Sequence, residues 1–167
     1  MPRDYDQTAS PTLLIADTDR TQRAIIGATA VQLGFHIVHA ASVEAADRHL
    51  GSRRFDTVIV DLALGERDGI ELLRSISKLQ GVPRVIIVSD CEERILNAAV
   101  RFAHAAGISD AVAVPKPIDV ERLRALLSRK VSPHPTGGPA ATFPPMTAAA
   151  IARGLDNSEF FPVFQPK

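Results

Sequence analysis

The sequence predicts an α/β protein whose core is a five-stranded parallel sheet covered by helices on both faces. Short apolar runs alternate with amphipathic stretches from residue 11 to residue 130. The runs at 57–61 and 84–89 are apolar almost throughout, which is typical of strands buried on both faces of a sheet. Hydrophobic residues make up 46% of the chain, whereas aromatic residues make up 5% and Trp is absent, so we expect an aliphatic core.

Five strands are expected, each of them a short apolar run. They lie at residues 12–17, 36–40, 57–61, 84–89 and 110–114. The run TLLIAD at 12–17 and the β-branched run TVIVD at 57–61 both end in an acid. The run at 36–40 is less apolar than the others and is the weaker strand candidate.

Five helices are expected to alternate with these strands, at 19–34, 42–50, 68–80, 90–106 and 118–129. Asp19 and Gln22 have the spacing of a capping box, Ser42 can cap the second helix, and Asp90 with Glu93 can begin the fourth. Apolar residues at helical spacing predict the buried faces of the later helices. These residues are Ile70, Leu73, Ile76 and Leu79, then Ile95, Ala99, Phe102 and Ala106, then Leu123, Leu126 and Leu127.

Charge, cysteine content and hydropathy exclude several classes of protein. Lys plus Arg equal Asp plus Glu at 19 each, so we expect no nucleic-acid partner. Cys91 is the single cysteine, which rules out an internal disulfide and fits a reducing, cytoplasmic location. No apolar run approaches the roughly 20 residues of a membrane helix, so no membrane partner is expected. Residues 1–10 are polar, without a secretory signal, and are expected to be disordered.

The composition changes after the last expected helix. Residues 11–130 form the expected domain, whereas 131–145 (VSPHPTGGPAATFPP) contain no Asp, Glu, Lys or Arg and are dense in Pro and Gly. Such a segment cannot form a regular helix and is typical of a linker. Residues 146–167 are expected to be structured again, but they are too few for a domain.

Four polar residues follow the expected strands at their carboxyl ends, where open α/β sheets place their functional crevice. Asp17, Asp61 and Ser89 end three of the strands, and Lys116 lies just beyond the fifth. Two carboxylates repel each other unless a cation lies between them, and oxygen ligands of this kind suit Mg²⁺. A carboxylate can attack phosphorus to form an aspartyl phosphate, and phosphoryl transfer needs mainly positioning and charge neutralisation. The residues therefore predict a Mg²⁺-assisted phosphoryl acceptor.

The fragments LLIADTD, FDTVIVDLALGERDG, VIIVSD and PKPID, in this order and at these separations, resemble the receiver domain of bacterial two-component response regulators. The resemblance covers about residues 11–130 and implies a flavodoxin-like (βα)5 fold. It also implies that Asp61 takes a phosphoryl group from a sensor histidine kinase. The metal ligands would be Asp17, Asp61 and the backbone carbonyl of Ala63.

The same resemblance assigns the remaining site residues. Ser89 would be the switch hydroxyl that reorients toward the phosphoryl group, and Lys116 would contact a phosphoryl oxygen. A cis peptide is expected at Lys116–Pro117, and Asp68-Gly69 matches the turn that opens the third helix. A homodimer through the fourth helix, fifth strand and fifth helix is a plausible further consequence of the resemblance.

Three departures from the family pattern bear on the mechanism. Thr18 stands where a second acid is usual, so Mg²⁺ is expected to bind more weakly. Thr18 is either a metal ligand or a polar loop residue. Whether Asp19 partly replaces the missing acid depends on where its side chain points, which the sequence leaves open. Gly65 stands where Pro is common. Ala113 replaces the usual aromatic switch residue, so the output must use another route than the Ser/Thr–Tyr coupling.

The tail from Met146 to Lys167 ends RGLDNSEFFPVFQPK and resembles the opening of an EAL-type domain, a family that hydrolyses cyclic di-GMP with divalent metals. This resemblance covers only about 20 residues. It implies a receiver with its linker, cut from a longer regulator at the start of a truncated EAL domain. The chain is therefore not expected to hydrolyse cyclic di-GMP itself, whereas its full-length parent is expected to be a cyclic di-GMP phosphodiesterase.

Two other functions remain as alternatives. Thr18 and Ala113 favour a degenerate receiver, which would act as an interaction or dimerisation module without phosphorylation. A small enzyme with a flavin or nucleotide site is disfavoured, because the loop DTDRTQR after the first strand carries acids that would repel phosphate.

Overall fold

The computed structural model describes residues 10–64 and 69–129. The predicted linker at 131–145, the EAL-like segment at 146–167 and residues 1–9 of the predicted disordered N-terminus lie outside the described residues. Five strands form one parallel sheet in the order β2-β1-β3-β4-β5. They are β1 (Thr12–Ala16), β2 (His36–Ala40), β3 (Thr57–Asp61), β4 (Arg84–Ser89) and β5 (Ala111–Pro115). The predicted fold class is confirmed.

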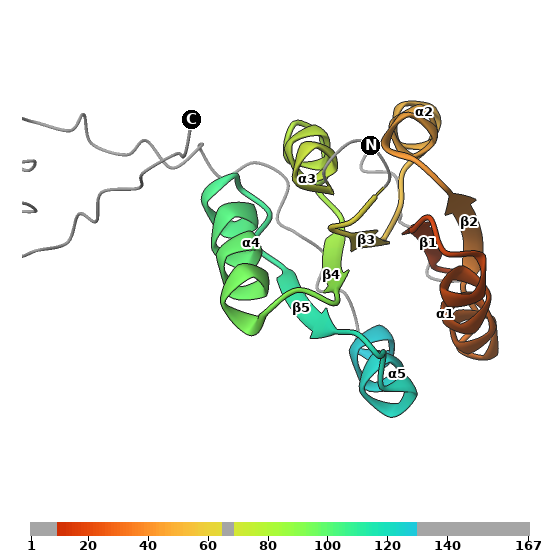
Figure 1. Ribbon diagram of the computed structural model, residues 1–167. Coiled ribbons are helices and arrows are strands. Elements are labelled where there is room, and N and C mark those ends of the chain that lie inside the picture. Colours follow the sequence, from red (N-terminus) through yellow and green to blue (C-terminus); the bar gives the residue numbers. More distant parts are fainter. Residues whose placement is uncertain (1–9, 65–68, 130–167) are drawn as a thin grey trace, which may run out of the picture. The chain divides into compact units, whose positions relative to one another are not determined.

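Five helices cover the two faces of the sheet (Figure 1). They are α1 (Arg20–Gln32), α2 (Val43–Ser52), α3 (Gly69–Ser77), α4 (Glu93–Ala105) and α5 (Val120–Ser128). Helices α2, α3 and α4 pack on one face, whereas α1 and α5 pack on the other. Among the residues described, no helix combines the length and apolar character needed to cross a membrane.

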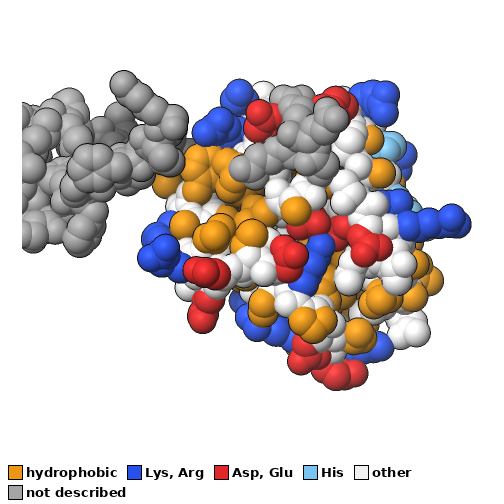
Figure 2. All heavy atoms as spheres, in the orientation of Figure 1, with side chains coloured by type: hydrophobic (Ala, Val, Ile, Leu, Met, Phe, Trp, Pro, Cys, Tyr) orange, Lys and Arg blue, Asp and Glu red, His pale blue; other side chains and the backbone are white. Residues whose placement is uncertain are grey.

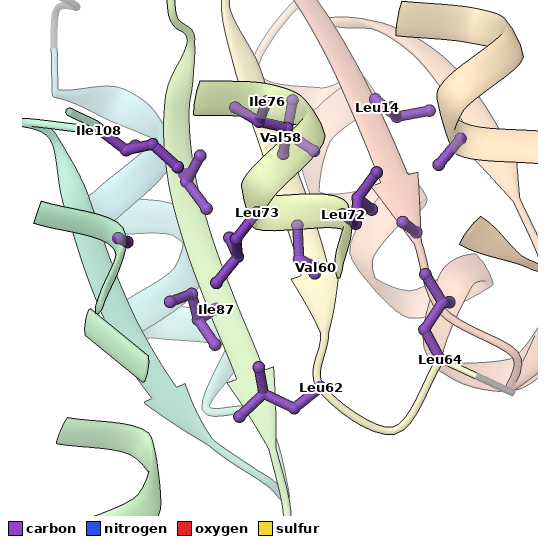
Figure 3. Packing of buried hydrophobic residues seen from close by; sticks show 14 of the residues in the cluster. Leu14, Val58, Val60, Leu62, Leu64, Leu72, Leu73, Ile76, Ile87 and Ile108 are labelled. Atoms are coloured by element: carbon purple, nitrogen blue, oxygen red, sulfur yellow. The ribbon is translucent and has the colours of Figure 1, made fainter. Parts of the chain in front are cut away.

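Two aliphatic cores result from the alternation of side chains along the central strands. On β4, Val85 and Ile87 belong to the cluster under α2, α3 and α4, whereas Ile86 and Val88 belong to the cluster under α1 and α5. Figure 3 shows the first of these clusters, with Leu73 of α3 lying over the sheet near Ile87. Both faces of the sheet are thus covered, which is why the central strands β1, β3 and β4 are apolar almost throughout.

The register of the sheet aligns the carboxyl ends of its strands. Ala16 pairs with Val60, Asp61 with Val88, and Ser89 with Pro115. The residues at or just after these ends therefore meet at one edge.

The start of α4 differs from the sequence prediction. Asp90 was expected to begin this helix, but α4 begins at Glu93 and its N-cap, Glu92, makes no side-chain cap hydrogen bond. The backbone N–H of Cys91 donates to Ser89 Oγ at 3.1 Å, which holds the preceding loop at the end of β4 instead. The last helix also begins later than expected, at Val120 rather than Ile118, and Asp119 is its N-cap.

The buried face of α4 is shifted by one residue from the predicted one. Leu96, Ala99 and Ala103 are buried, whereas Ile95 is 48% exposed. The neighbouring residues Ile95 and Leu96 are both apolar, so both stripes satisfy the helical period and share Ala99. Packing against β4 and β5 selects the stripe that contains Leu96.

Candidate functional site

Two buried carboxylates lie at the carboxyl edge of the sheet. Asp61 is the last residue of β3 and is 3% exposed, and Asp17 directly follows β1 and is fully buried. Burying a charged group is costly unless it is paired. Figure 2 shows acidic side chains gathered around a basic one on the face turned to the viewer. The partner of the two carboxylates therefore determines what this site can do.

Lys116, which follows β5, bridges the two carboxylates. Its Nζ donates to Asp61 Oδ2 at 2.8 Å and to Asp17 Oδ2 at 3.1 Å. Burial alone would lower the pKa of Lys116, but the hydrogen bonds to Asp61 and Asp17 and the charges of both carboxylates outweigh it. The pKa of Lys116 is therefore raised, and the ammonium is charged at neutral pH.

The other oxygen of each carboxylate accepts a backbone hydrogen bond. The N–H of Asp19 donates to Asp17 Oδ1 at 2.7 Å, and the N–H of Ala63 donates to Asp61 Oδ1 at 3.0 Å. These bonds fix the orientation of both carboxylates relative to the loops that follow β1 and β3. Of the four polar residues predicted to converge, the side chains of Asp17, Asp61 and Lys116 are in contact. The fourth, Ser89, contacts Lys116 through its backbone carbonyl.

The ion pairs of this site join two carboxylates to one ammonium. The three side chains in contact therefore include one more acidic group than basic groups. In the described part of the chain, no group of three or more His, Cys, Asp or Glu side chains is arranged to hold a metal ion. A divalent cation here would rely on two carboxylates, a backbone carbonyl, and water or phosphate oxygens, which is a donor set that suits Mg²⁺.

In the loop after β1, the residues that follow Asp17 offer fewer ligands for a cation than an additional acid would. Thr18 is exposed. The carboxylate of Asp19 caps α1, because its Oδ1 accepts from the N–H groups of Thr21 at 2.7 Å and Gln22 at 3.3 Å. Asp19 is thus committed to the helix terminus through this oxygen.

Ser89 ends β4 and is fully buried. Its Oγ accepts from the N–H of Cys91, and its backbone carbonyl accepts from the N–H of Lys116 at 2.8 Å. Ser89 is therefore tied both to the loop before α4 and to the residue that bridges the carboxylates. The peptide between Lys116 and Pro117 is cis, as the sequence predicts.

Gly69 opens α3 directly beneath the end of β3. A Cβ added at this position would lie 2.3 Å from the carbonyl oxygen of Asp61 and 2.8 Å from Cα of Leu62. The N–H of Gly69 also donates to the carbonyl of Leu62 at 3.0 Å. The absence of a side chain allows α3 to begin against the backbone that carries Asp61.

Two arginines were not singled out from the sequence. Arg23 of α1 donates through Nη1 to the backbone carbonyl of Asp17, and so holds the end of β1. Arg84, the first residue of β4, is buried and pairs with Asp110 at the opposite edge of the sheet. A charged residue at the head of the otherwise apolar run RVIIVS was the available signal for Arg84.

Comparison with known families identifies the class to which this fold and site belong. Residues 13–128 match the response regulator receiver domain. The match covers more than half of the chain, and the chain belongs to this family. The matched region is a receiver domain rather than a phosphodiesterase domain.

Among curated proteins, cyclic di-GMP phosphodiesterase RocR of Pseudomonas aeruginosa is 32% identical over 115 residues, which cover 67% of this chain and 29% of that protein. Regulatory protein VirG of Rhizobium rhizogenes is 31% identical over 103 residues, covering 62% of this chain and 42% of that protein. The chain therefore spans less than half the length of either relative.

Solved structures agree with the fold. The chemotaxis response regulator CheY4 of Vibrio cholerae superposes with a TM-score of 0.63 at 19% identity, covering 72% of this chain and 98% of that chain. A response regulator from Burkholderia pseudomallei, with a phosphorylated aspartic acid, calcium ion and citrate, has a TM-score of 0.61 at 23% identity, covering 71% of this chain and 67% of that chain.

Proposed function

We propose that this receiver accepts a phosphoryl group on Asp61 from a sensor histidine kinase, with Mg²⁺ as its cofactor. The observation that carries the proposal is the pair of buried carboxylates, Asp61 and Asp17, bridged by the Lys116 ammonium at 2.8 and 3.1 Å. This arrangement combines a fixed nucleophile with a fixed positive charge. Phosphoryl transfer requires little more from a protein than positioning and charge neutralisation.

In the proposed reaction, a carboxylate oxygen of Asp61 attacks phosphorus and forms an O–P bond. The bond between phosphorus and the donor nitrogen of the kinase histidine breaks, and its electron pair stays with that nitrogen. Lys116 neutralises charge on the phosphoryl oxygens. Asp17, Asp61 and the backbone carbonyl of Ala63 would hold Mg²⁺, which supplies further positive charge when bound.

Ser89 is the proposed switch hydroxyl. In the structure, Ser89 Oγ accepts a hydrogen bond from the N–H of Cys91. Phosphorylation adds about −1.5 to −2 charge at the end of β3. If the Ser89 hydroxyl moves toward that charge, it gives up the hydrogen bond from Cys91. The loop between β4 and α4 would lose this bond. The surface of α4, β5 and α5, which we propose as a homodimer interface, would then change its conformational equilibrium.

The output proposed for the parent protein is hydrolysis of cyclic di-GMP by an attached EAL domain. Two observations favour it: the relative RocR is a cyclic di-GMP phosphodiesterase, and residues 146–167 resemble the opening of an EAL domain. The receiver would regulate this output through the segment at 131–145.

Binding of beryllofluoride tests the phosphoacceptor proposal, because this anion imitates a phosphoryl group on a carboxylate. We expect beryllofluoride with Mg²⁺ to raise the thermal unfolding midpoint of the chain. Asp61→Asn should abolish the increase, whereas Asp56→Asn, at the other edge of the sheet, should keep it. An equal increase in Asp61→Asn would contradict the proposal.

A degenerate receiver that works without phosphorylation is the second candidate, favoured by the exposed Thr18 and by the Asp19 carboxylate that caps α1. Titration with Mg²⁺ distinguishes the two. We expect Mg²⁺ to bind at millimolar or lower concentration, and Thr18→Asp to tighten binding by roughly tenfold because ligand charge helps to set affinity. Absence of Mg²⁺ binding by the natural chain, with binding restored in Thr18→Asp, would favour the degenerate receiver.

A further inference from the structure

Arg84 is a buried charged residue that the phosphorylation site does not use. It begins β4 and is 4% exposed. Its Nε donates to Asp110 Oδ2 at 2.8 Å, just before β5, in an ion pair at the amino edge of the sheet. A buried charge of this kind is costly unless its donors are satisfied.

A second nitrogen of the Arg84 guanidinium, Nη1, reaches the end of α5. Nη1 donates to the carbonyl of Leu126 at 2.9 Å and to the carbonyl of Arg129 at 3.0 Å. The carbonyl of Leu126, in the last turn of α5, also accepts from the N–H of Arg129 at 3.3 Å, and Arg129 is the C-cap of the helix. The last carbonyls of a helix lack the regular helical partner. A planar guanidinium can donate to both carbonyls and to a carboxylate at the same time, which the compact ammonium of a lysine does less well. Arg84 is thus a side-chain cap for the last described helix.

Helix α5 and β4 also contribute side chains to the same buried cluster. Ile86 and Val88 of β4 share a buried cluster with Leu123 and Leu127 of α5. The next residue of β4 is Ser89, at the phosphorylation site. Strand β4 therefore carries Ser89 at its carboxyl end and Arg84 at its amino end. Arg84 holds the end of α5, after which the chain continues beyond residue 129.

We propose that Arg84 is a positioning residue that anchors the end of α5 to β4 and β5 and thereby couples the state of Asp61 to the segment that follows residue 129. The coupling part of this inference rests on the proposed function. It supplies a route to the output that does not require an aromatic residue at Ala113.

Hydrogen exchange of the full chain, with and without beryllofluoride and Mg²⁺, tests the anchor. In Arg84→Met, we expect amides in the last turn of α5 to exchange about tenfold faster or more, since charge-assisted bonds to its carbonyls are lost. Arg122→Met is the matched control, because Arg122 also donates to a backbone carbonyl, that of Ala113, but is exposed. In Arg122→Met, the last turn of α5 should exchange as in the natural chain.

The coupling is read from the change in exchange that beryllofluoride causes at the end of α5 and beyond it. We expect this change in the natural chain and in Arg122→Met, and its loss in Arg84→Met, with beryllofluoride still bound at Asp61. If Arg84 has a purely structural role, Arg84→Met would accelerate exchange equally with and without beryllofluoride. The change caused by beryllofluoride would then be preserved, which would overturn the coupling. Unaltered exchange in Arg84→Met would overturn the anchor itself.

Asp110→Asn provides the test if Arg84→Met does not fold, because it keeps Arg84 and its two carbonyl bonds but removes the charge of its partner. It should reduce the beryllofluoride-dependent change at the end of α5, and an undiminished change would count against the coupling. Failure of the natural chain to bind beryllofluoride would instead contradict the proposed function. The anchor itself would still be tested by exchange without beryllofluoride.

Discussion

Lys116 is the residue on which the charge balance of the site depends. Its ammonium bridges Asp61 and Asp17, and these partners raise its pKa above the ordinary value of 10.5 despite burial. A raised folded-state pKa contributes stability that is fully present below the unfolded pKa and is lost as pH rises through the folded one.

Lys116→Met should therefore be less stable than the natural chain at neutral pH, and the gap should narrow as pH rises above about 10.5. Denaturant unfolding at a series of pH values measures the free energy of unfolding of each protein. Lys78→Met, which removes an exposed lysine, should show no such gap. A gap for Lys116→Met that stays constant above pH 11 would refute the assigned contacts.

His39 of β2 makes a second prediction at the residue scale. His39 is exposed overall, but partial desolvation of its ring and the charge of Arg23 both lower its pKa below the ordinary 6.5. A histidine whose folded-state pKa is lowered costs stability as pH falls below 6.5, because the unfolded chain binds the proton more readily.

An NMR titration of His39 should give a pKa below 6.5, and Arg23→Gln should raise it partway toward that value. Arg48→Gln, which removes an exposed arginine of α2, should leave the titration unchanged. If Arg23→Gln did not move the pKa of His39, the charge of Arg23 would not be acting on it.

Strand ends were easier to predict from the sequence than side-chain directions. Asp17, Asp61 and Lys116 end or follow parallel strands, so the topology alone brings them to one edge. The sequence left open whether Asp19 faces the metal site or caps α1, because both are local choices of one side chain. The bonds of Arg84 to the end of α5 join residues 42 and 45 positions apart and required the packed structure.

At the scale of elements, α3 depends on a residue without a side chain. Gly69→Ala would place Cβ 2.3 Å from the carbonyl oxygen of Asp61, which is backbone and cannot move aside without shifting β3 or α3. We expect destabilisation by roughly 1–3 kcal/mol and weaker beryllofluoride binding at Asp61.

Gly51→Ala is the matched comparison, because a Cβ at Gly51 of α2 meets no atom within 4 Å. That substitution should be neutral or stabilise the protein by about 0.5–1 kcal/mol through helix propensity. Denaturant unfolding of both variants checks the pair. Equal effects of the two substitutions would contradict the close approach of α3 to Asp61.

The sequence predicted each strand and helix found in residues 10–64 and 69–129, but the terminal residues of the helices were less certain. The pairing of Asp90 with Glu93 looked like a cap for α4, yet Ser89 Oγ holds the N–H of Cys91 and the helix begins at Glu93. Capping patterns are local, whereas this hydrogen bond depends on where β4 ends. The helical period likewise could not choose between Ile95 and Leu96, which packing against the sheet decides.

At the scale of the whole molecule, the carboxyl ends and the amino ends of the strands carry different groups of charged residues. The carboxyl edge holds Asp17, Asp61 and Lys116, and the amino edge holds Arg84 with Asp110 and the end of α5. Strand β4 runs from one of these edges to the other and shares a buried cluster with α5. In the proposed function, chemistry at the first edge would alter the exit of the chain at the second.

Transfer of a phosphoryl group from acetyl phosphate tests the central proposal most directly. The chain is incubated with acetyl phosphate and Mg²⁺, and mass spectrometry of the intact protein and of its peptides locates the label. We expect one phosphoryl group on the peptide that contains Asp61, dependent on Mg²⁺ and absent in Asp61→Asn. A chain that stays unlabelled under these conditions, or that carries the label elsewhere, would contradict the account.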